Sequence, residues 1–161
     1  IMSMLIMREI AKGKLTAAAD PDTLQAYAYV PDWARAAVQL AEQRAELGKF
    51  EDIPFPGHAF SIHDLQRCIA ENTQLKTRIN RFPWWIMRLL GPFWELAREM
   101  HEMRYLYEMP HQIGAAKFDQ LLPEFVPTAL KDVMLAGLPA DIHPDKAVRT
   151  ASSTPIHISS G

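Results

Sequence analysis

Residues 82–110 constrain the fold of this chain more than any other stretch. They read FPWWIMRLLGPFWELAREMHEMRYLYEMP and hold three of the four tryptophans and four of the eight methionines. Gly91 and Pro92 interrupt the run, which predicts a kinked helix or two helices that meet at this point. In the second half, apolar residues recur at alternating steps of three and four, which predicts one apolar helix face formed by Phe93, Leu96, Met100, Met103 and Tyr107.

This stretch predicts a buried helix pair rather than a membrane span. Its most apolar part, residues 82–94, includes Arg88 and is shorter than the roughly 20 residues that a bilayer core requires. Burying each large side chain in a core contributes about 1.5–3 kcal/mol. We therefore expect the stretch to dominate the hydrophobic core and to make no contact with a membrane.

The composition is typical of a soluble globular domain. The chain has 161 residues, of which 48% are hydrophobic and 22% are charged. A net charge of −2 provides no excess of positive charge to bind the phosphates of a nucleic acid. A single cysteine, Cys68, excludes an internal disulfide and favours a reducing compartment. We expect a cytoplasmic protein with no nucleic-acid partner.

Short strands and helices are predicted to alternate along the chain. Strands are expected over residues 15–19, 26–30, 51–55 and 76–82, where β-branched or aromatic residues cluster or alternate with polar ones. Helices are expected over residues 3–12, 33–47, 62–72, 115–122 and 129–135. Residues 139–161 are mainly polar, contain several prolines and show no periodic hydrophobic pattern. This composition predicts a disordered tail.

Helix ends are marked by capping residues. Gly13 suits a C-cap after the first helix, and Asp32 is expected to cap the helix that follows it. Ser61 with Asp64 forms a capping-box pattern. Thr128 is expected to cap the last helix. In the helix over residues 33–47, the buried stripe is expected to consist of Ala37, Leu40, Ala41 and Leu47.

No set of residues predicts a metal site or a catalytic centre. His101-Glu102 begins like a zinc-protease helix, but Tyr105 stands where the second histidine is needed. Cys68 lies inside a predicted helix, where a buried, unreactive thiol is the better interpretation. The sequence has no Gly-x-Ser-x-Gly elbow and no glycine-rich phosphate loop. The residues alone therefore predict a helix-rich α/β core without an identifiable active site.

Three stretches, taken in order, nevertheless resemble a known family. They are YAYVPDWARA at residues 27–36, FSIHDL at residues 60–65 and KFDQLLPEFVPTAL at residues 117–130. Together they resemble the C-terminal, substrate-side half of the extended short-chain dehydrogenases/reductases, the NAD(P)-dependent epimerases, dehydratases and reductases. The resemblance covers residues 1–138 and implies the helix-rich C-terminal portion of a Rossmann-type protein, with a few short strands and about six helices.

Two features of that family are missing from this sequence. One is its glycine-rich nucleotide loop, and the other is its Tyr-x-x-x-Lys pair, in which the tyrosine exchanges a proton and the lysine lowers its pKa. We therefore expect NAD or NADP to be bound by a half that precedes Ile1. The residues present then hold no catalytic or cofactor-binding group and make up the part that contacts a small-molecule substrate.

The resemblance implies four substrate-side residues: Gln25, Tyr29, Arg81 and Trp85. Family members that act on nucleotide-sugars often have an arginine where this chain has Gln25, so we expect a different substrate, although Gln25 as a plain surface residue fits equally well. A non-catalytic binding or scaffold protein of the same ancestry is the alternative function. If a half is missing, Met4, Met7 and Trp33 are expected at an exposed apolar surface that drives self-association.

Overall fold

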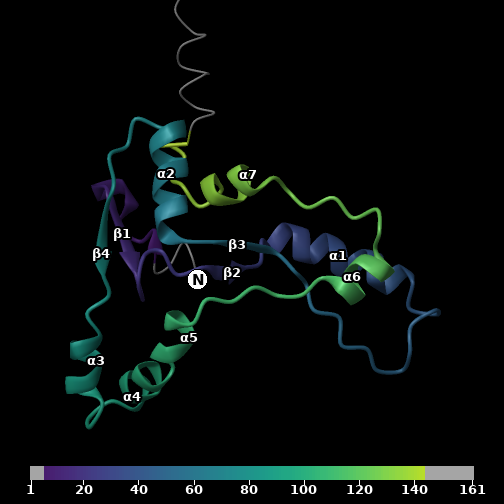
Figure 1. The fold of residues 1–161 in the computed structure, drawn as a ribbon, viewed down its shortest axis with the longest axis horizontal. Coiled ribbons are helices and arrows are strands. Elements are labelled where there is room, and N and C mark those ends of the chain that lie inside the picture. The colour runs from purple at the N-terminus through teal and green to yellow at the C-terminus, as the bar shows by residue number, and fades with distance from the viewer. Residues whose placement is uncertain (1–5, 144–161) are drawn as a thin grey trace, which may run out of the picture.

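A computed structural model describes residues 6–143 of the chain (Figure 1). Within these residues it contains four short strands, seven α-helices and one 3-10 helix, so the predicted mixed α/β class is confirmed. The predicted tail lies outside the described residues from position 144 onward, as do Met4 and the beginning of the first predicted helix.

The first sheet is a parallel pair of strands from distant parts of the chain. β1 (Lys14–Ala17) pairs with β4 (Arg78–Arg81), and Leu15 lies opposite Ile79. The 3-10 helix η2 (Ile10–Lys12) leads into β1 and ends at Gly13, which has a left-handed φ of 67°. A Cβ atom at this position would lie 2.7 Å from the carbonyl oxygen of Lys76. The predicted glycine C-cap is confirmed, and the close approach to the next strand adds a second reason for glycine.

α2 (Ile62–Asn72) covers this sheet, and α7 (Leu130–Leu135) lies beside it (Figure 1). The predicted capping box is present, because the hydroxyl of Ser61 accepts from the amide of Asp64 at 3.1 Å and the Asp64 carboxylate accepts from the amide of Ser61 at 3.0 Å. Leu65 and Ile69 on the inner face of α2 are fully buried. The main hydrophobic core lies here, and its buried residues are Met7, Ile10, Leu15, Ala17, Phe60, Ile62, Leu65, Ile69, Met134, Leu135 and Leu138.

The second sheet is an antiparallel pair that runs towards a smaller hydrophobic cluster. β2 (Gln25–Tyr27) pairs with β3 (His58–Phe60). From β2 the chain enters α1 (Val30–Glu42), which packs near α6 (Ala116–Leu121) at one end of the molecule (Figure 1). The buried residues of this cluster are Ala36, Phe118 and Leu122, with Leu40, Ile53, Phe55 and Phe125 partly buried against them.

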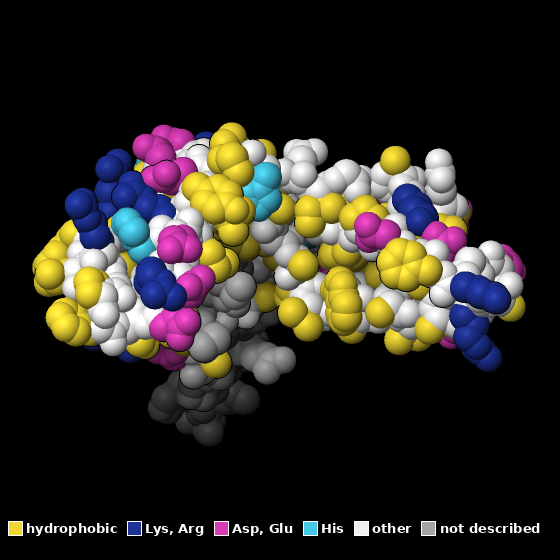
Figure 2. Space-filling model, turned by 90° about the horizontal axis from the view of Figure 1, so that it is seen from below, with side chains coloured by type: hydrophobic (Ala, Val, Ile, Leu, Met, Phe, Trp, Pro, Cys, Tyr) yellow, Lys and Arg dark blue, Asp and Glu magenta, His cyan; other side chains and the backbone are white. Residues whose placement is uncertain are grey.

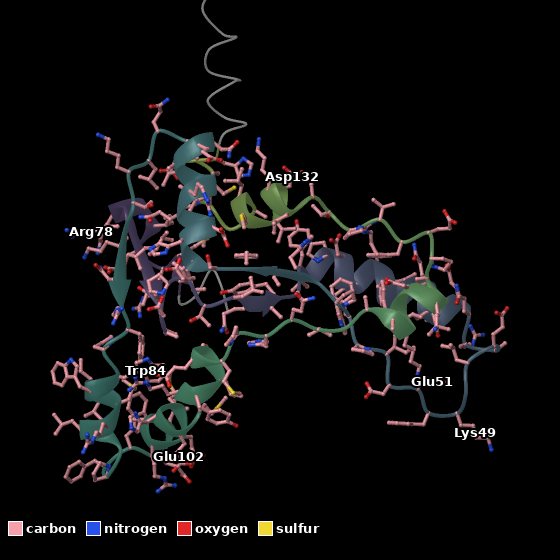
Figure 3. The ribbon with its side chains drawn as sticks, viewed as in Figure 1. Lys49, Glu51, Arg78, Trp84, Glu102 and Asp132 are labelled. Carbon is pink, nitrogen blue, oxygen red and sulfur yellow. The ribbon has the colours of Figure 1, made fainter. Side chains whose placement is uncertain are left out.

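The strand predicted over residues 51–55 is not formed. This segment belongs to the long connection between α1 and β3, which carries Lys49 and Glu51 at the edge of the molecule (Figure 3). Its apolar side chains Ile53 and Phe55 pack against the α6 cluster instead of joining a sheet. The β-favouring residue types were present, but no partner strand lies beside them.

The expectation that residues 82–110 dominate the core is wrong. Gly91-Pro92 does divide the stretch, into α3 (Trp84–Leu90) and α4 (Glu95–Glu102), and α5 (Arg104–Glu108) follows. However, Ala97 is the one buried residue of these three helices. Phe93 is 91% exposed and Trp85 is 68% exposed. The three helices form a separate lobe below β4 (Figure 1), so their large side chains have few neighbours to cover them.

The expected burial of α1 is wrong for Ala37 and Ala41, although Leu40 is partly buried against the α6 cluster. The helix begins at Val30 and ends at Glu42, earlier at both ends than predicted. Its buried residues are Asp32 and Ala36, whereas Ala37 and Ala41 of the predicted buried stripe are exposed. The helix therefore turns most of its apolar side chains away from the rest of the chain.

These core assignments predict different costs for two apolar truncations. Leu65→Ala should destabilise the protein by about 2–5 kcal/mol, because it leaves a cavity in the main core. Phe93→Ala should change the free energy of unfolding by no more than about 0.5 kcal/mol, because the ring is already in solvent. Urea denaturation followed by circular dichroism measures both. A cost for Phe93→Ala equal to that for Leu65→Ala would contradict the placement of the core.

Candidate functional site

The three stretches that carry the family resemblance meet around the end of β2. Tyr27 in the first stretch stacks on Phe60 in the second, with ring centroids 4.3 Å apart and an interplanar angle of 23°. Asp32 in the first stretch binds Thr128 in the third. We call these four residues the β2 junction. It joins segments that lie up to 96 positions apart in the sequence.

Asp32 is the central polar residue of the β2 junction. Its side chain is buried and accepts three hydrogen bonds of 2.7 Å, from the backbone amide of Thr128, the hydroxyl of Thr128 and the guanidinium of Arg35. Burial alone raises the pKa of this carboxyl, but the hydrogen bonds from Arg35 and Thr128 outweigh burial and hold the pKa below its ordinary value. Asp32 is therefore an ionised structural anchor.

The predicted capping role of Asp32 is wrong. The N-cap of α1 is Tyr29, with no side-chain capping bond, and Asp32 lies inside the first turn. There its negative charge still faces the positive end of the helix. Thr128 likewise does not cap α7, whose N-cap is Ala129, because its amide and hydroxyl are both directed to Asp32.

Arg35 completes the anchor on the solvent side. Besides its bond to Asp32, its guanidinium donates to the carbonyl oxygen of Val126 at 3.0 Å and lies 5.0 Å from the centre of the Phe125 ring. The arginine therefore fastens the segment before Thr128 onto α1 by a charge-assisted hydrogen bond and a cation–π contact.

Further aromatic side chains lie near β2, on α3 and α5. Burial, with a smaller effect from Tyr107, raises the pKa of Tyr27 to about 12. Trp84 contacts Tyr107 at a centroid distance of 5.9 Å, and its indole donates to the carbonyl oxygen of Ala18 at 2.5 Å (Figure 3). A tyrosine with so high a pKa stays protonated at neutral pH. This region can pack against apolar or aromatic groups, and Tyr27 itself supplies no base for proton abstraction at neutral pH.

The four predicted substrate-side residues lie on different elements. The side-chain amide of Gln25 donates to the carbonyl oxygens of Tyr107 and Met109, at 3.0 and 3.2 Å, so it anchors the end of α5 to β2. Tyr29 precedes α1. Arg81 on β4 is exposed and lies 3.8 Å from Asp20, and Trp85 is exposed on α3. Their contact with a substrate stays a prediction, and Gln25 has a structural role that the sequence did not indicate.

An open cavity of about 500 Å³ lies elsewhere, between η2 and the segment after α7. Its lining residues are Met7, Arg8, Ile10, Ala11, Gly137, Leu138 and Pro139. None of the predicted substrate-side residues lines it. Both of its walls continue directly into undescribed residues, so we assign it no ligand.

The described residues contain no cluster of three or more metal-binding side chains. Over the same residues, no helix has the length and apolar character needed to cross a bilayer. Burial raises the pKa of the Cys68 thiol, which disfavours a reactive thiolate. Arg35, Thr128, Tyr27 and Tyr107 were missed as organising residues. Arg35 stands three positions after Asp32, a helical ion-pair spacing that could have marked it. Thr128, Tyr27 and Tyr107 have partners distant in the sequence, so no local pattern marks them.

The lowered pKa of Asp32 predicts a specific pH dependence of stability. The stability from this carboxylate is present above the ordinary aspartate pKa of about 4 and is lost as the pH falls through the lower folded-state pKa. Asp32→Asn should cost about 1–3 kcal/mol at neutral pH. The difference from the unmodified protein should shrink as the pH falls below about 4.

Urea denaturation at a series of pH values measures this difference. Asp52→Asn, at an exposed position in the connection between α1 and β3, is the matched control and should follow the unmodified protein throughout. A difference for Asp32→Asn that stayed constant from neutral to acidic pH would show that the carboxylate charge does not contribute.

Comparison with known proteins adds no family assignment: no family model, curated protein or solved structure matches this chain.

Proposed function

We propose that this chain supplies the substrate-side part of an NAD(P)-dependent oxidoreductase, epimerase or dehydratase of the extended short-chain dehydrogenase/reductase type. One observation carries the proposal: the three stretches that resemble this family come together at the β2 junction. Tyr27 stacks on Phe60, and Asp32 binds Thr128. If the three stretches descend from one folded unit, they are expected to contact one another. Stretches that match the family by chance are not expected to do so.

The outer face of α1 supports the need for a second half. Trp33 is 55% exposed and Val38 is 60% exposed, and both Ala37 and Ala41 beside them face solvent. The predicted exposure of Trp33 is thus confirmed. The same prediction is wrong for Met7, which is buried in the main core. An apolar helix face of this kind is covered in a stable protein, and the nucleotide-binding half is the proposed cover.

The chemistry near β2 favours a weakly charged substrate. The amide of Gln25 is already bonded to two backbone carbonyls, so this position supplies no cationic clamp for a diphosphate. The side chains nearby are mainly aromatic, including Tyr27, Trp84 and Tyr107. NAD or NADP and the proton-transferring groups belong to the preceding half in this proposal, and the β2 junction holds the substrate-side part in its shape.

A titration with NADH tests the proposal. The proposal requires a natural reading frame with residues upstream of Ile1, and the protein made from it should bind NADH with saturation in the micromolar range, followed by nicotinamide fluorescence. Residues 1–161 alone should give a flat titration, because they hold no nucleotide loop and no Tyr-x-x-x-Lys pair. Adding Thr128→Val to the longer protein should weaken substrate turnover more than NADH binding, because Thr128 belongs to the substrate-side part.

Two results would contradict the proposal. Saturable NADH binding by residues 1–161 alone would show that the cofactor site lies within them. No NADH binding by the longer protein would favour the alternative, a non-catalytic binding or scaffold protein of the same ancestry. As a control, Asp52→Asn in the longer protein should leave both binding and turnover unchanged.

A further inference from the structure

The turn between α3 and α4 presents large apolar side chains to solvent. Trp85 and Leu89 lie one helical turn apart on α3 and are 68% and 66% exposed, and Phe93 in the turn is 91% exposed. Trp94 continues the same surface at the start of α4. We call these four residues the α3–α4 tip. It lies at the opposite end of the molecule from α1 and α6 (Figure 1), so the half proposed to cover α1 has no need to cover it.

The α3–α4 tip is presented by a packed pair of helices. Ala97 is buried where α4 meets α3, and a Cβ atom on Gly91 would lie 3.7 Å from the Cα atom of Arg98. Trp84 anchors the base of α3 through its bond to Ala18 and its contacts with Phe82 and Tyr107. The packing of Ala97 and Trp84 therefore holds α3 and α4 in one orientation and so determines which of their side chains face solvent.

Charges of both signs lie near the α3–α4 tip: Arg88 lies on α3 next to Leu89, and Glu95 directly follows Trp94. From position 78 to position 94 the sequence contains three arginines, Arg78, Arg81 and Arg88, and no acidic residue. Among the described residues, Arg81 approaches Asp20 at 3.8 Å, and no ion pair involves Arg78 or Arg88. Figure 2 shows hydrophobic side chains, Lys or Arg side chains and Asp or Glu side chains close together at the end of the molecule that carries α3.

We propose that the α3–α4 tip lies on the surface of a membrane that contains anionic lipids. Tryptophan favours the boundary between headgroups and acyl chains, and Leu89 and Phe93 are placed to enter the apolar side of that boundary. Arg88, one residue from Leu89 on the same exposed helix, is placed to contact a lipid phosphate. Glu95, which directly follows Trp94, and Glu99 both form ion pairs with Arg98.

A lipid surface fits the α3–α4 tip better than a second copy of the chain. A protein interface of stable size needs about one hydrogen bond for every 100–200 Å² and a broad, complementary surface. The tip is a projecting turn whose exposed side chains are apolar, with arginine side chains beside them. α3 has seven residues, so it is suited to lie in the interface and too short to cross a bilayer.

Flotation of the protein with lipid vesicles tests the proposal. The protein should float with vesicles of phosphatidylcholine mixed with phosphatidylglycerol and float much less with phosphatidylcholine alone. Salt should weaken the binding, because it screens the attraction between arginine and lipid phosphate. Arg88→Glu should lower the partition coefficient for the mixed vesicles by about fivefold or more.

A matched pair of double variants locates the contact. Trp85→Ser with Leu89→Ser should reduce vesicle binding by about tenfold or more, because both side chains leave the lipid. Val38→Ser with Phe50→Ser removes two side chains that are 60% and 88% exposed elsewhere, and it should bind vesicles as the unmodified protein does. Circular dichroism checks that both variants retain the fold.

Three results would overturn the proposal. The first is no flotation with mixed vesicles, and the second is an equal loss of binding in the two double variants. The third is self-association that disappears in the Trp85 and Leu89 variant without any vesicle binding, which would assign the tip to a second copy. The NADH titration does not depend on any of these outcomes, so the two proposals fail separately.

Discussion

The buried carboxylate of Asp32 is the interaction on which the arrangement of this chain depends. A buried charge is tolerated in a protein when it is paired and fully hydrogen-bonded. Here the pairing is supplied by Thr128 and Arg35, in three bonds of 2.7 Å. Because Thr128 lies 96 positions from Asp32, satisfying this one side chain ties α1 to the segment that leads into α7. With the Tyr27–Phe60 stack beside it, the bond links the main core to the α6 cluster.

The same interaction determines the orientation of α1. With Asp32 turned inward, Ala36 one turn later is buried, and Trp33 and Val38 must face outward. A helix normally places its apolar stripe against its own core, and this reversal is the observation that supports our proposal of a second half beside α1. The lobe of α3, α4 and α5 shows a similar reversal at the other end of the molecule, where Phe93 is almost fully exposed. The two surfaces lie at different ends of the molecule, and we propose a different partner for each.

Local signals predicted local structure well. Gly13 ends its helix in the left-handed conformation, and Ser61 with Asp64 forms the capping box, because each depends on residues within a few positions. Burial was predicted poorly, because it depends on which segments meet in space. Most of residues 84–108 are helical, but Phe93 and Met103 of the predicted apolar face lie outside α4 and α5, and the assumption that an apolar face must be a core face was wrong. The bonds of Gln25 to the end of α5, like that of Asp32 to Thr128, join distant segments and leave no pattern in a single sequence.

Hydrogen–deuterium exchange of residues 1–161 tests the central claim most directly, that the core lies between the parallel sheet and α2 rather than in the tryptophan-rich helices. Amides of β1, β4 and the buried face of α2, such as those of Leu15, Asn80 and Ile69, should exchange most slowly and set the global stability. Amides of α3 and α4 should exchange about a hundredfold faster or more, through local opening. If α3 and α4 proved the most protected part of the chain, the tryptophan-rich stretch would be the true core, and the placement of the core beneath α2 would be contradicted.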